Sequence, residues 1–330
     1  MWIMPELLKD KFTSLNICVI GDLILDEYII GKVTRVSPEA PIPVVDQQAR
    51  EYKPGGAANV ALNLINLGVN TYLAGVVGDD THGLILKKLI EEVLPEKGQG
   101  IITLKGRITT TKTRVVAHNQ HVVRIDHEEH TDIGNDVSTQ LMDYIADIHK
   151  SNKLDAVILQ DYEKGMLHHA NIPAFIEFLN ECGIRIIVDP KDKNFWMYRH
   201  VHLFKPNRKE AEKAIGKKIP MTEDALADAA LLLESRLHNE VTVITLSEYG
   251  IYIKDAENKV WRHSEVMEVI DVCGAGDAVI GIVAAAYCAG VPMPQIALLG
   301  NIAGGIVCGE RGVVAVSLDR LQKAYNNMSL

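Results

Sequence analysis

The chain has 330 residues, of which 47% are hydrophobic and 23% charged, a composition typical of a globular protein. Lys and Arg total 34 against 43 for Asp and Glu, so the formal net charge is −9. This acidic balance disfavours nucleic acid or an anionic membrane as the main partner, and an anionic substrate would need a local basic cluster. The five cysteines are scattered and form no C-x-x-C pair, which favours a reducing, cytoplasmic setting.

Neither the N-terminal segment nor the long apolar run near the C-terminus predicts a membrane segment. Residues 1–15 carry several charges and no continuous apolar core, so no signal peptide is expected. The apolar run 278–291 is rich in Ala and Gly and is followed by Pro292. This run predicts a buried helix rather than a membrane span.

Apolar strands alternate with helices along the chain. In chain order we expect a strand at 16–20, a helix at 57–67, a strand at 71–77, a helix at 82–93, a strand at 156–160, a helix at 172–182, strands at 185–188 and 203–205, helices at 208–215 and 223–238, a strand at 241–245 and a helix from 278. This alternation predicts an α/β fold, with a mostly parallel central sheet covered by helices on both faces.

Polar residues follow several of these strands. Asp22 follows the first strand, Asp161 the strand at 156–160, Asp189 the strand at 185–188 and Ser247 the strand at 241–245. In open α/β sheets, ligands bind outside the carboxyl ends of the strands. A binding site is therefore expected at this edge of the sheet.

Two segments, 28–53 and 107–127, interrupt the alternation and read as extended chain. Pro38, Pro41 and Pro43 restrict the first segment to an edge strand or a loop. We interpret the two segments as a small β lid beside the main sheet. No repeat or linker marks a second full domain, so a single domain over residues 1–330 is expected.

The most informative segment is 271–277. Gly274, Ala275 and Gly276 form a turn that opens a helix, where backbone N–H groups and the helix dipole favour an anion. Asp277 lies in the first helical turn, placed to accept a hydroxyl proton beside that anion, as phosphoryl transfer requires. An ordinary helix start explains the same residues about equally well, since Asp is favoured there.

Two further segments carry candidate binding residues. Gly55 and Gly56 allow a ligand to approach the backbone, and Asn59 can donate to and accept from hydroxyls. A plain loop and a solvated helix residue are the local alternative. Asn207 and Glu210 have capping-box spacing, but Glu210 could also lie, through water, near a Mg²⁺ ion that bridges nucleotide phosphates.

A basic cluster stands out in this acidic chain. Lys112, Arg114 and Arg124 share strand parity, so one face of the second lid segment could present all three, although edge strands also carry charges that deter aggregation. Asp161 and Lys164 follow a buried strand and could bind a sugar hydroxyl and a phosphate. A surface salt bridge is the commoner alternative for such a pair.

Other nucleotide and metal motifs are missing. No Gly-x-x-x-x-Gly-Lys-Ser loop occurs, and no Gly-x-Gly-x-x-Gly follows the first strand, so the commonest nucleotide-binding folds are disfavoured. The histidines at 118, 121, 127 and 130 lack the ligand spacing of a zinc site.

These residues resemble the ribokinase-like carbohydrate kinases. Residues 55–59 match the N-terminal signature of that family, residues 271–277 match its C-terminal signature, and Asn207-x-x-Glu210 lies between them. The resemblance covers nearly the whole chain. It implies ATP and Mg²⁺ as cofactors, with a monovalent cation as a further candidate.

The resemblance also implies a role for each motif residue. Asp277 would be the base for a sugar hydroxyl, and the N–H groups of Gly274, Ala275 and Gly276 would stabilise the transferred phosphoryl group. The residues implied for magnesium and the nucleotide are Asn207, Glu210, Ser247, Gly250 and Asn301. Those implied for the sugar are Asp22, Gly55, Gly56 and Asn59.

A closer likeness exists within the family. Residues 35–41, 54–60, 111–115, 119–120, 161–165 and 247–250 resemble kinases that act on D-glycero-D-manno-heptose 7-phosphate. Some of those kinases are fused to a nucleotidyltransferase with a His-x-Gly-His motif, which this sequence lacks, so it resembles the stand-alone form. Cys273 and Ala278 replace threonines common among relatives, which bears on nucleotide contacts and on any monovalent-cation loop.

The expected reaction is therefore ATP-dependent phosphorylation of heptose 7-phosphate at the anomeric C1 hydroxyl, in ADP-heptose and lipopolysaccharide core biosynthesis. Lys112, Arg114, Arg124 and Lys164 are the candidates to hold the 7-phosphate. One alternative is a kinase for another sugar or nucleoside, which would need no basic cluster for a second phosphate. Another is a non-catalytic sugar-binding regulator, against which the intact acidic motif residues count.

A homodimer joined through the lid is also expected. The lid segments carry apolar positions at Val44, Val45, Val115, Val116, Val122 and Val123. A small sheet is marginally stable in water unless one face is buried, and a second lid related by a two-fold axis would bury it. The alternative is a lid that folds back on its own domain.

Overall fold

The structure, a computed structural model, describes residues 5–95, 98, 100–118, 120–264 and 269–327. Nine of the described strands form the main sheet, in the order β13-β12-β11-β10-β9-β8-β1-β4-β5. The parallel strands are β1 (Asn16–Gly21), β4 (Asn70–Gly78), β5 (Gly100–Leu104), β8 (Ala156–Gln160), β9 (Arg185–Asp189), β10 (Leu203–Phe204) and β11 (Val241–Thr245). At one edge β12 (Ile251–Lys254) and β13 (Lys259–Arg262) run antiparallel. The predicted α/β fold class is confirmed.

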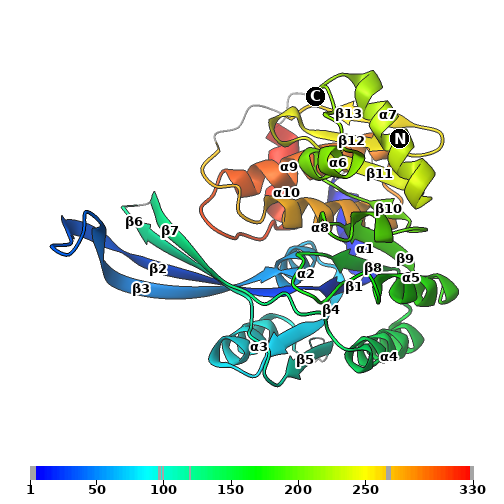
Figure 1. The fold of residues 1–330 in the computed structure, drawn as a ribbon. Helices are drawn as coiled ribbons and strands as arrows, with labels where there is room; N and C mark the ends of the chain where they lie inside the picture. Colours follow the sequence, from blue (N-terminus) through cyan, green and yellow to red (C-terminus); the bar gives the residue numbers. More distant parts are fainter. Residues whose placement is uncertain (1–4, 96–97, 99, 119, 265–268, 328–330) are drawn as a thin grey trace.

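Helices cover both faces of the main sheet (Figure 1). One face is covered by α1 (Pro5–Thr13), α2 (Ala57–Asn66), α3 (Thr81–Val93), α8 (Ala275–Cys288), α9 (Met293–Cys308) and α10 (Leu318–Asn327). The other is covered by α4 (Asn135–Asn152), α5 (Ile172–Glu181), α6 (Arg208–Ile215) and α7 (Glu223–Leu237), with the short helix η1 (Phe195–Met197).

The strand β1 shows why the sheet reads as continuous apolar runs. Ile17 and Val19 pack into the core on one face, whereas Cys18 and Ile20 pack into the core on the other. A strand covered on both faces needs apolar residues at every position.

The apolar run near the C-terminal end forms α8, which packs between α2 and α9 in the same core. The prediction of a buried helix here is confirmed, and its residues from Asp277 to Ala286 are buried. Of the helices that the structure describes, none has the length and apolar character needed to cross a membrane.

Four described strands form a second sheet, which we call the lid. They are β2 (Leu23–Val36), β3 (Pro43–Gly56), β6 (Thr111–Ala117) and β7 (Gln120–His127), in the order β3-β2-β6-β7. The lid extends as an arm away from the helices and the main sheet (Figure 1). Pro38 and Pro41 lie between β2 and β3, and Pro43 begins the edge strand β3, as predicted. Asn119, part of one motif, lies outside the described residues.

Candidate active site

A pocket of about 560 Å³ lies where the lid meets the carboxyl ends of the main strands. Asp26 of β2 and Arg114 of β6 line it from the lid. Tyr162, which follows β8, and Asp277 of α8 line it from the main body. A larger hollow of about 850 Å³ lies beside α5 and η1, but none of the motif residues lines it. Motif residues such as Gly56, Gly274 and Asp277 line the smaller pocket instead.

Asp277 is held by three hydrogen-bond donors. Its Oδ1 accepts from the Tyr162 hydroxyl at 2.7 Å and from Gln160 Nε2 at 3.4 Å. Its Oδ2 accepts from Asn59 Nδ2 at 2.7 Å. Asn59 comes from the N-terminal signature and Asp277 from the C-terminal one, so the fold brings both signatures to a single contact.

The buried position of Asp277 changes its acidity. Burial raises its pKa to about 7, and the hydrogen bonds from Tyr162 and Asn59 oppose that rise. The charges of Asp189 and Asp26 also contribute to this raised pKa. A general base works best when its pKa lies near the operating pH. Asp277 therefore has the acidity expected of a base at neutral pH.

A chain of amides orients Asn59. Asn63 lies one turn further along α2, and its Nδ2 donates to the backbone oxygen of Asn59 at 2.9 Å and to its Oδ1 at 3.3 Å. Asn63 Oδ1 in turn accepts from the backbone N–H of Val316 at 2.9 Å. On the facing helix, a Cβ at Gly281 would lie 3.3 Å from the Cβ of Asn63, so glycine allows α2 and α8 to pack closely. Asn63 is a positioning residue that the sequence did not single out.

The turn before Asp277 has the geometry of an anion site. Gly274 has a φ of 79°, which favours glycine, and a Cβ there would lie 2.9 Å from Asn59 Nδ2. A side chain at 274 would thus displace the amide that holds Asp277. Ala275 and Gly276 begin α8, at the positive end of the helix dipole. The Ala275 N–H donates to the Val272 backbone oxygen at 3.3 Å, and Gly276 is exposed to solvent.

Asp22 and Asp26 both follow β1, but they have different surroundings in the structure. Asp22 is 2% exposed and accepts backbone hydrogen bonds from Tyr162, Lys164 and Met166 at 2.7, 3.1 and 3.1 Å. It shapes the loop after β8 and is not among the described residues that line the pocket. Asp26, which the sequence did not single out, lines the pocket instead.

Asp161 has a similar supporting position. It is 2% exposed, and its Oδ2 accepts from the Tyr198 hydroxyl at 2.7 Å and from Asn194 Nδ2 at 3.0 Å. Its Oδ1 accepts from the backbone N–H of Glu163 at 2.7 Å. Asp161 is also not among the described lining residues of the pocket, so these contacts account for its carboxylate without a sugar.

Gly55 and Gly56 make the base of the lid compact. A Cβ on Gly55 would lie 2.3 Å from Asp26 Oδ2. Gly56 has a φ of 59°, and a Cβ there would lie 2.4 Å from the backbone oxygen of Asp22. Both glycines are thus required by packing, and Gly56 also lines the pocket. A direct contact of either backbone with a sugar stays a prediction.

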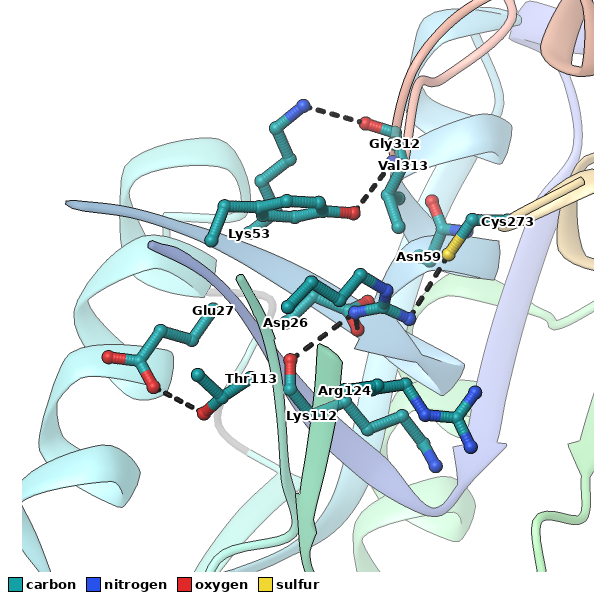
Figure 2. A network of polar contacts seen from close by, with 12 residues as sticks. Asp26, Glu27, Lys53, Asn59, Lys112, Thr113, Arg124, Cys273, Gly312 and Val313 are labelled. Carbon is teal, nitrogen blue, oxygen red and sulfur yellow. Dashed lines mark hydrogen bonds and ion pairs between the residues drawn. The ribbon is translucent and has the colours of Figure 1, made fainter. Parts of the chain in front are cut away.

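All the predicted basic side chains line the pocket, namely Lys112, Arg114, Arg124 and Lys164. Lys112 and Arg124 extend from the lid in the same direction (Figure 2). Each cation has a carboxylate partner. Lys112 and Lys164 pair with Glu128, Arg114 with Asp26, and Arg124 with Asp126.

Arg114 also joins the lid to the motif turn. Its guanidinium pairs with the buried Asp26 and donates to the Cys273 sulfur at 3.2 Å. The side chains of Arg114 and Asp26 are 9% and 6% exposed, so this pair is the most buried of the four.

The capping box predicted at α6 is present. Asn207 Oδ1 accepts from the Glu210 N–H at 2.9 Å, and Glu210 Oε2 accepts from the Asn207 N–H at 2.8 Å. Glu210 Oε1 accepts from Lys191 Nζ at 2.5 Å, and Lys191 lines the pocket. Both Glu210 oxygens are thus engaged. A hydrated ion could be reached without breaking these bonds, whereas direct coordination would break them.

Potential metal ligands gather elsewhere too. Among the described residues, Asp132, His168 and His169 bring ligand atoms within 4.8 Å of one another. Lys193 Nζ lies 4.0 Å from Asp132, so a cation already faces this group.

The residues predicted for the nucleotide meet around segment 262–264. Asn301 Nδ2 donates to the backbone oxygens of Arg262 and His263 at 2.9 and 3.2 Å. A Cβ on Gly250 would lie 2.1 Å from the Arg262 oxygen. Ser247 begins the short helix η2 (Ser247–Tyr249), and its backbone oxygen accepts from Gly250 N–H at 3.1 Å. The structure brings the three together, and their contact with a nucleotide stays a prediction.

Comparison with known proteins shows the family to which the chain belongs. The family model described as pfkB family carbohydrate kinase matches residues 14–320, so the chain belongs to the pfkB family of carbohydrate kinases. Its activity is that of a phosphotransferase with an alcohol group as acceptor.

Curated relatives carry names that are more specific than the family description. A "Bifunctional protein HldE" from Wolinella succinogenes is 41% identical over 298 residues, covering 90% of this chain and 62% of that protein. A protein of the same name from Syntrophotalea carbinolica is 36% identical over 325 residues, covering 97% of this chain and 65% of the relative. The chain therefore spans less than two thirds of the length of these relatives.

Solved structures show the same fold. Phosphofructokinase-2 from Escherichia coli in complex with potassium superposes with a TM-score of 0.79 at 20% identity, covering 96% of this chain and 99% of that one. A putative ribokinase from Agrobacterium tumefaciens gives a TM-score of 0.74 at 16% identity, covering 94% and 97% of the two chains. The fold is thus ribokinase-like.

Proposed function

We propose that the chain phosphorylates D-glycero-D-manno-heptose 7-phosphate at its anomeric C1 hydroxyl with ATP, giving the 1,7-bisphosphate for ADP-heptose and lipopolysaccharide core biosynthesis. One observation carries the proposal: five basic side chains, the four predicted ones and Lys191, line the same pocket as the buried Asp277. A sugar that already carries a phosphate would meet both features. The motifs that resemble heptose-phosphate kinases and the similarity to proteins named HldE support it.

Asp277 would act as the general base. Its carboxylate takes the proton of the anomeric hydroxyl as that oxygen attacks the γ-phosphorus of ATP. The N–H groups of Gly274, Ala275 and Gly276 would face the oxygens of the transferred phosphoryl group. Tyr162 and Asn59 hold the carboxylate in place by the hydrogen bonds described above.

Magnesium and ATP would bind near the turn formed by residues 274–276. Bound Mg²⁺ would neutralise charge on the phosphates during transfer. Glu210 and Asn207 are the residues proposed to hold it, through water, because both Glu210 oxygens are engaged. Lys191 connects Glu210 with the pocket, which suits a contact with the phosphates between donor and acceptor.

Ser247, Gly250 and Asn301 are proposed to line the nucleotide site. A monovalent cation is proposed near the turn formed by residues 274–276. Cys273 replaces a threonine common among relatives, so it bears on the binding of this cation.

The sugar would lie between Asp26 and Asp277. Asp26 lines the pocket, so we propose it, rather than Asp22 or Asp161, as the carboxylate that binds sugar hydroxyls. Gly56 would allow the sugar to approach the base of the lid.

Lys112, Arg124 and Lys164 are proposed to hold the 7-phosphate. Arg114 would act mainly through Asp26, because it is already paired there.

We further propose that residues 1–330 act as one kinase domain and that two copies join through their lids. Val123 and Ile125 of β7 are 48% and 55% exposed, and burial in a second lid would remove this apolar surface from water. Val116 lines a separate hollow with Tyr28 and Asp271. Val123 and Ile125 are therefore better interface candidates than Val116, which the sequence analysis had grouped with Val123.

A substrate panel tests the proposed reaction. ATP turnover would be compared for heptose 7-phosphate, unphosphorylated heptose, fructose 6-phosphate, ribose and adenosine. We expect the highest kcat/KM with heptose 7-phosphate. A preference for a sugar or nucleoside without a phosphate would favour the generic kinase, and binding without turnover would favour a regulator.

A further inference from the structure

Glu128 lies between two of the lysines that line the pocket. Its Oε1 is 2.7 Å from Lys112 Nζ, and its Oε2 is 2.6 Å from Lys164 Nζ. Lys112 belongs to β6 of the lid, whereas Lys164 belongs to the loop after β8 in the main body. One carboxylate therefore joins a cation of the lid to a cation of the main body.

These ion pairs are shielded from solvent. The side chains of Glu128, Lys112 and Lys164 are 16%, 17% and 12% exposed. Burial alone would raise the pKa of Glu128, but hydrogen bonds from both lysines outweigh it and hold the pKa at about 2. Glu128 is thus a carboxylate at every pH at which the enzyme would work.

A carboxylate and a phosphate place the same demand on a pair of ammonium groups. Each presents two anionic oxygens that accept charge-assisted hydrogen bonds. While Glu128 holds both lysines, neither is free to receive a phosphate; Lys112 Nζ also has a longer contact of 3.4 Å with Asp126 Oδ2.

We propose that Glu128 occupies the place of the substrate's phosphate in the ligand-free protein and is displaced from Lys112 and Lys164 when a phosphorylated sugar binds. The identity of the sugar rests on the proposed function, whereas the competition for the lysines rests on the contacts above.

This exchange makes the pocket selective. A dianionic phosphate can accept from both lysines and so replace the hydrogen bonds that they donate to Glu128. A sugar without a phosphate cannot, so it would leave the internal pairs intact and gain no binding energy from the lysines. Binding therefore favours an anionic ligand, because only an anion can replace Glu128 as the partner of both lysines.

Neutralising Glu128 tests this competition. Glu128→Gln and Glu128→Ala should bind inorganic phosphate more tightly than the wild type in calorimetric titrations without ATP. We expect about a tenfold lower Kd, the effect of roughly one charge-assisted hydrogen bond. The KM for heptose 7-phosphate should fall similarly, while that for ATP stays unchanged.

Glu234→Gln provides the matched control. Glu234 pairs with Lys254 at 2.6 Å, with side chains 17% and 13% exposed, and does not line the pocket. The Glu234→Gln substitution removes one negative charge from a similarly buried ion pair, and it should leave the affinity for phosphate unchanged.

Two outcomes would overturn the inference. Weaker phosphate binding in both Glu128 variants would mean that Glu128 positions the lysines, and unchanged binding would mean that phosphate lies elsewhere. Thermal unfolding would verify that each variant is folded. If the wild type failed to phosphorylate heptose 7-phosphate, the titration with inorganic phosphate would still decide the role of Glu128.

Discussion

Replacing Asp277 by Asn should remove activity and, at high pH, increase stability. The pKa of this carboxyl is about 7, compared with an ordinary value of 3.8, chiefly because of burial. The folded state therefore holds the proton more tightly than the unfolded state. Stability is highest below the unfolded pKa and is lost as the pH rises from about 4 through 7.

The size of the effect follows from this difference. A pKa gap of about 3 units corresponds to about 4 kcal/mol of destabilisation once the carboxyl is fully ionised. An uncharged Asn avoids that cost. Tyr162 and Asn59 donate to different oxygens of Asp277, however, and Asn has an oxygen at only one of these positions, so one bond is lost at a cost of about 1–3 kcal/mol. We expect a net gain of about 2 kcal/mol at pH 8 from these opposing effects.

The gain should reverse in acid. At pH 5 most of the ionisation cost is absent in the wild type, while the lost hydrogen bond remains in Asp277→Asn. Urea unfolding from pH 5 to pH 8 would show the stability curves of the two proteins crossing. Turnover at pH 8 should fall by about 10²–10⁴, the usual effect of removing a general base.

Asp80→Asn serves as a control of opposite sign. Burial alone would raise the pKa of Asp80, but hydrogen bonds from the backbone of Thr109 and Gly83 outweigh it and lower the pKa. This variant should lose stability most at high pH, because a group with a lowered pKa stabilises the fold when ionised. A pH-independent stability difference for Asp277→Asn, or near-native turnover in the folded variant, would refute the reasoning.

Three further predictions use other contacts. Tyr162→Phe removes a donor that favours the ionised form of Asp277, so the acidic limb of the kcat/KM profile should move to higher pH; an unmoved limb would count against the contact. Glu210→Gln should raise the Mg²⁺ concentration needed for half-maximal activity, and an unchanged Mg²⁺ titration would place the ion elsewhere. Charged substitutions at both Val123 and Ile125 should convert a lid-joined dimer into monomers in light scattering, whereas a monomeric wild type at micromolar concentration would contradict the dimer.

The fold could be predicted from sequence where the pattern is local. Strands buried on both faces give apolar runs such as 16–20, and glycines mark the turn before Asp277. The helix α9 was missed because it is apolar on nearly every side and shows no amphipathic period. The short edge strands β12 and β13 have too few residues for a clear pattern.

The candidate site depended on contacts between distant residues. Asn59 and Asp277 are 218 positions apart, and nothing in either segment predicts their hydrogen bond. Asp22 and Asp26 both follow β1, and only the pairing of β2 with β6 places Asp26 beside Arg114. Lys191 carried no motif at all. Tyr162 lay within a recognised segment, but the signal there pointed to its charged neighbours.

The central claim is that the lid cations select a phosphorylated sugar whose anomeric hydroxyl then meets Asp277. The most direct measurement is phosphorus NMR of the product formed from ATP and D-glycero-D-manno-heptose 7-phosphate by the purified protein. We predict one new phosphate at C1, formed together with an equal amount of ADP, and little product from unphosphorylated heptose. A phosphate at another hydroxyl, or equal conversion of the unphosphorylated sugar, would contradict the claim.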